Sequence, residues 1–270
     1  PLTLALGVKD AFGDKPMCGG CGAKVGRAAL QTVLDDAFGD DAAVVQPGQV
    51  MSTDHLRSLT NDVVTMTQIS AIHALGDVSA MGAQPQAATA HIILPRMSAE
   101  MQMRTLREIT ETANAVMGDA GAKIIGGHTS LGDELTIGFT ITGLTKAPIT
   151  LAGARPGDAL ILTKPIGSGT IMAAEMAGKA AGRNVMECLT HMTRSQSIAS
   201  DLLSKANAMT DITGFGLAGH LRGMCDASGV GVILHLNAIP MMTEAMNLAA
   251  KGVRSSLFED NRLGAGMISG

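Results

Sequence analysis

The chain has 270 residues, of which 46% are hydrophobic, and its 20 Lys and Arg against 24 Asp and Glu give a net charge of -4. This length allows a large buried core and predicts two domains. The chain has no long basic run, no Trp and no Tyr, which excludes a surface that follows a nucleic-acid backbone or stacks on bases. No apolar run approaches the roughly 20 residues that cross a bilayer, and the N-terminus lacks a signal-peptide pattern, so we expect a cytoplasmic protein without membrane attachment.

The first notable segment is a glycine-rich stretch at residues 15–26, KPMCGGCGAKVG, which carries two thiols and two lysines. Its glycines give a mobile backbone, so this stretch is predicted to close over a substrate and bring a soft nucleophile beside a phosphate-binding cation. The pair Cys18 and Cys21 could also be half of a zinc site or a redox dithiol. No second CxxC or HxxxH motif completes four zinc ligands, which disfavours that alternative.

Acidic residues recur at the ends of the predicted elements that follow. Helical spacing covers residues 27–38, and the pair Asp40 and Asp41 then opens an apolar run, where it could hold a metal ion or lie solvated in a turn. A second predicted strand ends at residues 51–55 and includes Asp54. Asp77 falls inside a predicted helix over residues 64–80, where burial would require a cation or hydrogen-bond donors; otherwise we expect it to face solvent.

The middle of the chain predicts a strand-rich first half and a glycine turn. The turn follows the strand at residues 124–125, and its Gly126 and Gly127 could present backbone N–H groups to phosphate. The other expected elements are a strand at 84–94, a helix that begins at the cap Ser98 and stops at Gly118, and a strand at 135–144.

Residues 152–158 combine small residues with proline and glycine and are the best candidate linker. The second half is predicted to alternate helices and strands in an α/β layer. Asp211 lies in its glycine-hinged turn at residues 209–216. The predicted strands are residues 159–163 and 231–236, and the predicted helices are 170–181, 185–208 and one that follows the turn to about residue 227.

Seven short motifs occur in a fixed order along nearly the whole chain. They are residues 20–24, 40–44, 53–54, 74–82, 126–129, 162–165 and 209–216. Each is weak alone, but their joint order and spacing are hard to obtain by chance. In these motifs the sequence resembles the selenophosphate synthetase (selenide, water dikinase) family of the aminoimidazole ribonucleotide synthetase-like superfamily.

The resemblance implies a two-domain fold of α+β and α/β type. The N-terminal domain would be strand-rich and its sheet would pair across a homodimer into a barrel, and the C-terminal domain would be α/β. On this basis residues 1–26 form the glycine-rich catalytic loop, 27–151 the ATP-binding and dimerising domain, and 157–270 the C-terminal domain. Because the chain stops before the family's last glycine-rich region and does not begin with Met, we expect a piece of a longer polypeptide whose second domain is incomplete.

The resemblance also implies the reaction and its residues. The family makes selenophosphate from selenide, water and ATP and releases AMP and orthophosphate; Mg²⁺ is the expected metal, and whether a monovalent cation is also needed is left open. Cys21 and Lys24 fall on catalytic positions. The magnesium ligands fall on Asp41, Asp77 and Asp211. The ATP-contacting positions are Lys24, Phe38, Gly39, Asp40, Asp54, Asp77, Gly127, His128 and Thr129, the last three of them near the partner subunit.

Two departures and three alternatives accompany this resemblance. Ala23 replaces the second cysteine of the family's loop, which excludes a dithiol mechanism there, and His73 stands where the family often has Asn. The alternatives are a thiamine-monophosphate kinase-like enzyme, a hydrogenase-maturation-like enzyme and a non-catalytic nucleotide-binding paralogue. Cys21 together with Lys24 favours selenophosphate synthesis over the two enzymatic alternatives. The presence of these residues together with Asp41, Asp77 and Asp211 disfavours the non-catalytic paralogue.

Overall fold

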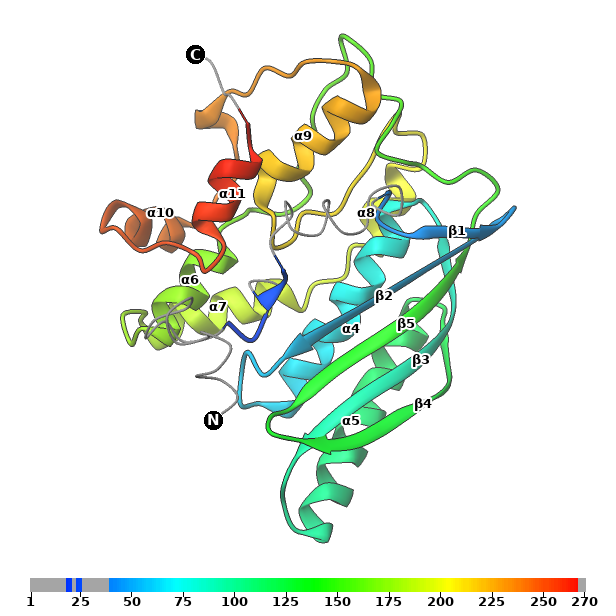
Figure 1. Ribbon diagram of the computed structural model, residues 1–270, viewed down its shortest axis with the longest axis vertical. Coiled ribbons are helices and arrows are strands. Elements are labelled where there is room, and N and C mark those ends of the chain that lie inside the picture. Colours follow the sequence, from blue (N-terminus) through cyan, green and yellow to red (C-terminus); the bar gives the residue numbers. More distant parts are fainter. Residues whose placement is uncertain (1–17, 21–22, 26–38, 267–270) are drawn as a thin grey trace, which may run out of the picture.

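The computed structural model describes residues 18–20, 23–25 and 39–266. Figure 1 shows a twisted sheet with two long helices behind it and a helix-rich second half beside it. The first half contains β1 (Ala43–Gln46), β2 (Gln49–Arg57), α4 (Val63–Ala80), β3 (Gln84–Pro95), α5 (Ala99–Asp119), β4 (Lys123–Gly132) and β5 (Thr136–Leu144). The second half contains α6 (Ser168–Met176), α7 (Gly182–Met192), α8 (Ser197–Leu202), α9 (Gly216–Ser228), η3 (Leu236–Ala238), α10 (Thr243–Ala250) and α11 (Phe258–Gly264).

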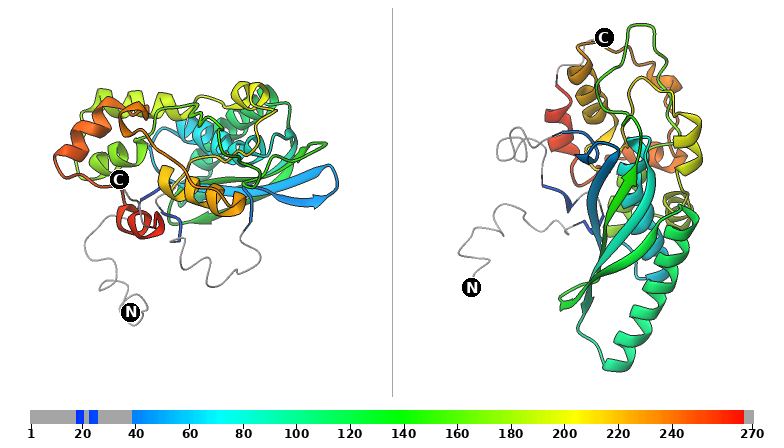
Figure 2. Two further views of the ribbon diagram at one scale, coloured as in Figure 1. Left: turned by 90° about the horizontal axis from the view of Figure 1, so that it is seen from above. Right: turned by 90° about the vertical axis from the view of Figure 1, so that its right-hand side faces the viewer.

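The five strands form one mixed, open sheet in the order β1-β2-β5-β3-β4. Only β3 and β4 pair in parallel, and the other neighbours are antiparallel. Both α4 and α5 lie on the same face of the sheet, as the side view in Figure 2 shows. The opposite face is therefore left without a helix from the described part of the chain.

The main core fills the space between the sheet and these two helices. Phe139 and Ile141 of β5 are fully buried, and Met66 and Val78 of α4 pack in the same cluster. Helix α5 begins as predicted, because the Ser98 side chain accepts a hydrogen bond from the backbone N–H of Met101 and caps the first turn. The predicted elements at 64–80, 84–94 and 135–144 are confirmed, whereas the strand expected to end at residue 55 continues to Arg57.

The glycine turn predicted at residues 126–130 is wrong. These residues continue β4, which pairs with β3 from Lys123 to Gly132 around a bulge between Ala88 and Thr89. A Cβ at Gly127 would lie 2.1 Å from the Ala90 carbonyl oxygen, so glycine is needed here for close strand contact. Gly127 therefore serves strand pairing within this chain, whereas a Cβ at Gly126 would meet no atom within 4 Å.

The second half differs most from the prediction. Within the described residues it contains helices and a single bridge between Ile166 and Met241, and neither residues 159–163 nor residues 231–236 form a strand. Ile161 is 66% exposed and Ile233 is 82% exposed, so these apolar runs lack the neighbouring strand that would pair with and bury them. The expected helix at 185–208 is two helices, α7 and α8.

Two further expectations concern the linker and the membrane. The predicted linker at 152–158 is irregular, and the predicted helix at 27–38 lies outside the described residues. None of the helices in the described part of the chain is long and apolar enough to span a bilayer.

Candidate active site

A carboxylate held by a lysine and a histidine lies where β2 meets α4. Asp54 Oδ2 lies 3.0 Å from Lys24 Nζ and 2.8 Å from His73 Nε2. The side chains of Asp54 and His73 are each only 11% exposed. Lys24, from the glycine-rich segment, is thereby fixed against the strand at the position where the family resemblance expects an ATP contact.

The spacing of residues along β2 and along α4 accounts for the contact of Asp54 with His73 and for a second contact beside it. On β2, Ser52 and Asp54 point to the same face, about 6.6 Å apart along the strand. On α4, His73 and Asp77 are four residues apart, on the same face and about 6 Å apart along the axis. The two spacings match, so Asp54 meets His73 while the Ser52 hydroxyl donates a hydrogen bond to Asp77 Oδ2. Asp77 therefore faces the sheet and not open solvent.

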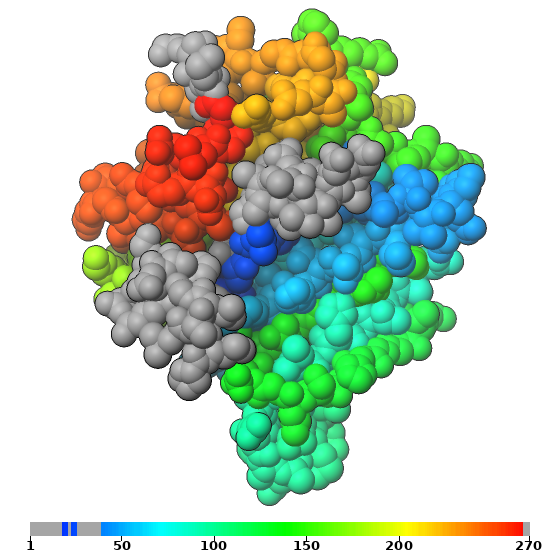
Figure 3. Space-filling view, in the orientation of Figure 1, coloured from blue at the N-terminus to red at the C-terminus, as the bar shows by residue number. Residues whose placement is uncertain are grey.

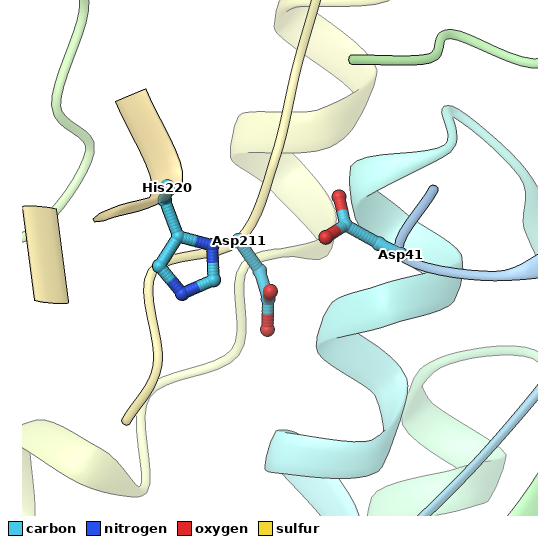
Figure 4. A group of neighbouring side chains, drawn as sticks. All are labelled: Asp41, Asp211 and His220. Carbon is cyan, nitrogen blue, oxygen red and sulfur yellow. The ribbon is translucent and has the colours of Figure 1, made fainter. Parts of the chain in front are cut away.

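Asp41 and Asp211 meet beside the same helix although 170 positions separate them along the chain. The Thr210 hydroxyl donates to Asp41 Oδ1 at 3.0 Å. A Cβ at Gly76 of α4 would lie 3.1 Å from Asp211 Oδ2, so the missing side chain leaves room for this carboxylate. Figure 4 shows Asp41 and Asp211 next to His220, and one potential ligand atom from each of the three lies within 4.8 Å of the others.

The three carboxylates disturb one another's ionisation. Burial, followed by the charge of Asp77, raises the pKa of Asp41 to about 7 against the opposing hydrogen bond from Thr210. Burial and the charge of Asp211 raise the pKa of Asp77 to about 7, and burial and the charge of Asp41 raise the pKa of Asp211 to about 7. Without a cation, these groups therefore resist full ionisation near neutral pH.

Asp54 behaves in the opposite way. Burial alone would raise its pKa, but the hydrogen bond and charge of His73 and the charge of Lys24 together lower the pKa well below its usual range. Asp54 is therefore ionised at neutral pH and already has Lys24 and His73 as partners. The acids that still need positive charge are Asp41, Asp77 and Asp211.

The residues present fit a hard divalent cation. Asp41 Oδ2 is buried and has no hydrogen-bond partner among the described residues. An unpaired carboxylate oxygen beside two further carboxylates is unfavourable unless a cation binds them. Oxygen donors with open positions suit Mg²⁺, which keeps several waters and also binds phosphate oxygens.

The remaining predicted site residues do not all lie near these carboxylates. The exposed side chain of Asp40 accepts a hydrogen bond from the Leu151 backbone N–H at 2.8 Å, and Gly39 is exposed beside it. Gly127, His128 and Thr129 lie on β4, which is three strands from β2 and thus roughly 14 Å away within one chain. Cys21 and Phe38 lie outside the described residues.

Three residues at the site, Ser52, Thr210 and His220, were not predicted from the sequence. Ser52 was detectable, because it precedes Asp54 by two residues and so shares its face of β2. Thr210 and His220 gave no such signal, because their significance depends on contacts between the segment after α8, helix α9 and Asp41.

Comparison with known proteins agrees with this arrangement. Residues 39–145 match the family described as AIR synthase related protein, N-terminal domain, and residues 155–261 match AIR synthase related protein, C-terminal domain. The selenide, water dikinase of Myxococcus xanthus is 34% identical over 259 residues, covering 87% of this chain and 73% of that protein. The enzyme of the same name from Geobacter metallireducens is also 34% identical, covering 87% and 74% respectively. The chain belongs to the selenide, water dikinase family.

Solved structures of other superfamily members share the fold. Thiamine monophosphate kinase from Aquifex aeolicus superposes with a TM-score of 0.67 at 18% identity, covering 87% of this chain and 80% of that one. A structure titled hydrogenase maturation protein HypE in complex with ATP gives 0.64 at 20% identity, covering 90% and 78%. At this identity the likeness establishes the fold alone, whereas the closer sequence relatives carry the selenide, water dikinase name.

Proposed function

We propose that this chain catalyses ATP-dependent synthesis of selenophosphate from selenide and water, with release of AMP and orthophosphate. Family membership supports the reaction. The observation that carries the proposal is that Asp41 and Asp211 lie together, with Asp77 close enough for its charge to raise the pKa of Asp41, beside the ion pair of Lys24 with Asp54. A bound triphosphate is polyanionic, and such a site supplies metal-held positive charge on one side and a lysine on the other.

Each group then has a role in the proposed mechanism. Asp41, Asp77 and Asp211 hold Mg²⁺, which when bound neutralises charge on the phosphates as two phosphoanhydride bonds break. Lys24 provides a point charge for a phosphate oxygen once ATP replaces its contact with Asp54. The Cys21 thiolate holds the soft selenide when the glycine-rich loop closes over the nucleotide.

The direct test is phosphorus NMR of the protein with ATP, Mg²⁺ and selenide. We expect resonances of selenophosphate, AMP and orthophosphate. Cys21→Ser should lose selenophosphate while retaining residual ATP hydrolysis, because serine cannot supply a soft thiolate. Cys18→Ser is the matched control in the same loop and should retain the wild-type yield. An unchanged yield from Cys21→Ser would remove Cys21 from the mechanism.

We also propose a homodimer in which the open sheet face is the contact surface and the two sheets close into a barrel. Figure 3 presents this face, with β2, β5, β3 and β4 side by side. A polar row crosses it where Thr140 of β5 pairs with Thr53 and Thr89, and the Thr140 hydroxyl donates to Thr53 Oγ1 at 2.9 Å. Dimerisation would let Gly127 and its β4 neighbours serve the partner's nucleotide.

Thr140→Lys should therefore convert a dimer into a monomer and lower AMP release at least about tenfold. The reason is that the substitution places a strongly hydrated charge at the centre of the proposed contact surface. Light scattering after size exclusion measures the mass. Thr110→Lys, at an exposed position on α5, is the control and should stay dimeric. If the wild-type protein were monomeric at assay concentrations while fully active, the barrel would be excluded.

The proposal also includes the roles of the domains and the cellular location. Residues 1–26 act as the catalytic loop, 27–151 as the ATP-binding and dimerising domain, and 157–270 as part of the C-terminal domain. The protein acts in the cytoplasm, where a thiol such as Cys21 stays reduced.

A further inference from the structure

Beside the proposed metal ligands, two polar side chains form a hydrogen-bonded chain that ends on Asp41. The ring of His220, on α9, has its Nδ1 3.4 Å from Thr210 Oγ1. The Thr210 hydroxyl lies 3.0 Å from Asp41 Oδ1. Figure 4 shows the His220 ring on the same side of the site as Asp211, with Asp41 facing both from the far side.

The direction of these hydrogen bonds follows from their backbone partner. The Thr213 backbone N–H donates to His220 Nε2 at 3.2 Å, so Nε2 presents its lone pair. In a neutral imidazole the proton is then on Nδ1, which donates to Thr210 Oγ1. The Thr210 hydroxyl could donate to the Asp211 carbonyl at 3.2 Å instead, but the Asp41 carboxylate is nearer and is the stronger acceptor.

This chain of donors provides a hydrogen bond to one carboxylate oxygen of Asp41 but not to the other. Oδ1 accepts from Thr210, whereas Oδ2 is buried without a partner among the described residues. Both ring nitrogens of His220 face protein atoms, which disfavours His220 as a direct ligand despite its place near the two carboxylates.

We propose that His220 and Thr210 are positioning residues that fix Asp41 so that Oδ2 is the atom that binds the divalent cation. This inference rests on the proposed function, because it takes Asp41 as a metal ligand. Hydrogen-bond partners that orient a ligating carboxylate typically change metal affinity 10- to 100-fold when removed. The role assigned to His220 acts through Thr210 and not through contact with the metal.

The test measures Mn²⁺ binding to the full chain in the presence of ATP by electron paramagnetic resonance, without turnover. Thr210→Val removes the hydroxyl at nearly constant volume and should weaken Mn²⁺ binding about tenfold. Thr210→Ser keeps the hydroxyl and is the matched control, expected to bind as the wild type does. Circular dichroism and thermal melting confirm that both variants fold.

A double-mutant cycle tests whether His220 acts through Thr210. His220→Phe keeps a ring beside Phe215 but removes both nitrogens, and should weaken Mn²⁺ binding about threefold to tenfold. His220→Asn returns a donor near the Nδ1 position and should recover part of the loss. The double variant with Thr210→Val should bind no more weakly than Thr210→Val alone, because the two residues form one chain.

Each of the following results would overturn the proposal. Wild-type affinity in Thr210→Val would show that the hydroxyl does not position Asp41, and multiplicative losses in the double variant would show that His220 acts independently. Nitrogen coupling to Mn²⁺ in electron spin echo spectra, lost in His220→Phe, would make His220 a direct ligand. If the wild-type chain bound no Mn²⁺ with ATP, the proposed function itself would be contradicted, and the positioning role with it.

Discussion

Asp41→Asn is expected to lower selenide-dependent AMP release by about 10²- to 10³-fold at saturating ATP and Mg²⁺. Asparagine keeps an oxygen that can accept from Thr210, but it replaces the unpartnered Oδ2 with an uncharged amide nitrogen that cannot ligate a metal. The measurement is AMP formation resolved by chromatography. Asp133→Asn, an exposed position in the turn between β4 and β5, is the control and should act as the wild type does.

The same variant should be more stable than the wild type when no metal is present. Because the pKa of Asp41 is raised from its usual value of 3.8 to about 7, the folded chain holds a proton that the unfolded chain has released between these values. The free energy of unfolding of the wild type therefore falls as pH rises from about 4 to about 7, and Asp41→Asn avoids this loss. The melting temperature of the metal-free variant should exceed that of the wild type by several degrees at pH 8 and by little at pH 4.

Lower activity together with higher metal-free stability distinguishes a functional carboxylate from a structural one. Mg²⁺ with ATP should raise the melting temperature of the wild type at pH 8 and have much less effect on Asp41→Asn. A variant that lost both activity and metal-free stability would identify Asp41 as a structural residue, and normal AMP release would remove it from the site.

Lys24→Ala should reduce selenide-dependent AMP release by about 10²- to 10³-fold, the second large effect. Lys24 Nζ lies 3.0 Å from Asp54 Oδ2, and Lys24→Ala removes the point charge that the described part of the glycine-rich segment offers to a phosphate oxygen. Lys146→Ala, which removes an exposed lysine after β5, is the matched control. Initial rates of AMP release at several ATP concentrations provide the measurement.

The two kinetic constants separate binding from catalysis in this variant. A role in the transition state lowers kcat, whereas a role restricted to ATP binding raises KM and leaves kcat unchanged. We expect both effects, with the larger on kcat. Wild-type AMP release by Lys24→Ala would show that the contact with Asp54 only anchors the segment.

How far the sequence predicted the fold depended on the type of signal. The α5 start was predictable because Ser98 caps it and helical periodicity follows. Residues 126–130 were misread because paired glycines usually mark a turn, whereas here Gly127 allows β4 to approach the Ala90 backbone. The run at 231–236 was misread as a strand, since an apolar run does not reveal whether a neighbouring strand is present to pair with it.

The candidate site was predictable only in part for a related reason. The family motifs drew attention to Asp41, Asp77 and Asp211. The structure places Asp41 and Asp211 in one cluster with His220, and Asp77 close enough for its charge to raise the pKa of Asp41. No local pattern connected Thr210 or His220 to Asp41, because their contact closes a loop of about 170 residues. Periodicity reports the faces of single elements, and such contacts between distant segments have no counterpart in it.

One consequence follows from where the carboxylates lie relative to the two matched domains. Asp41 and Asp77 belong to the first domain, while Thr210 and Asp211 belong to the second. Neither domain alone carries the complete set, so the cation proposed for this site would add cohesion across their boundary. By thermodynamic reciprocity, removing the cation with a chelator should weaken the association of the two domains. A change that weakens this association should in turn lower the affinity for the cation.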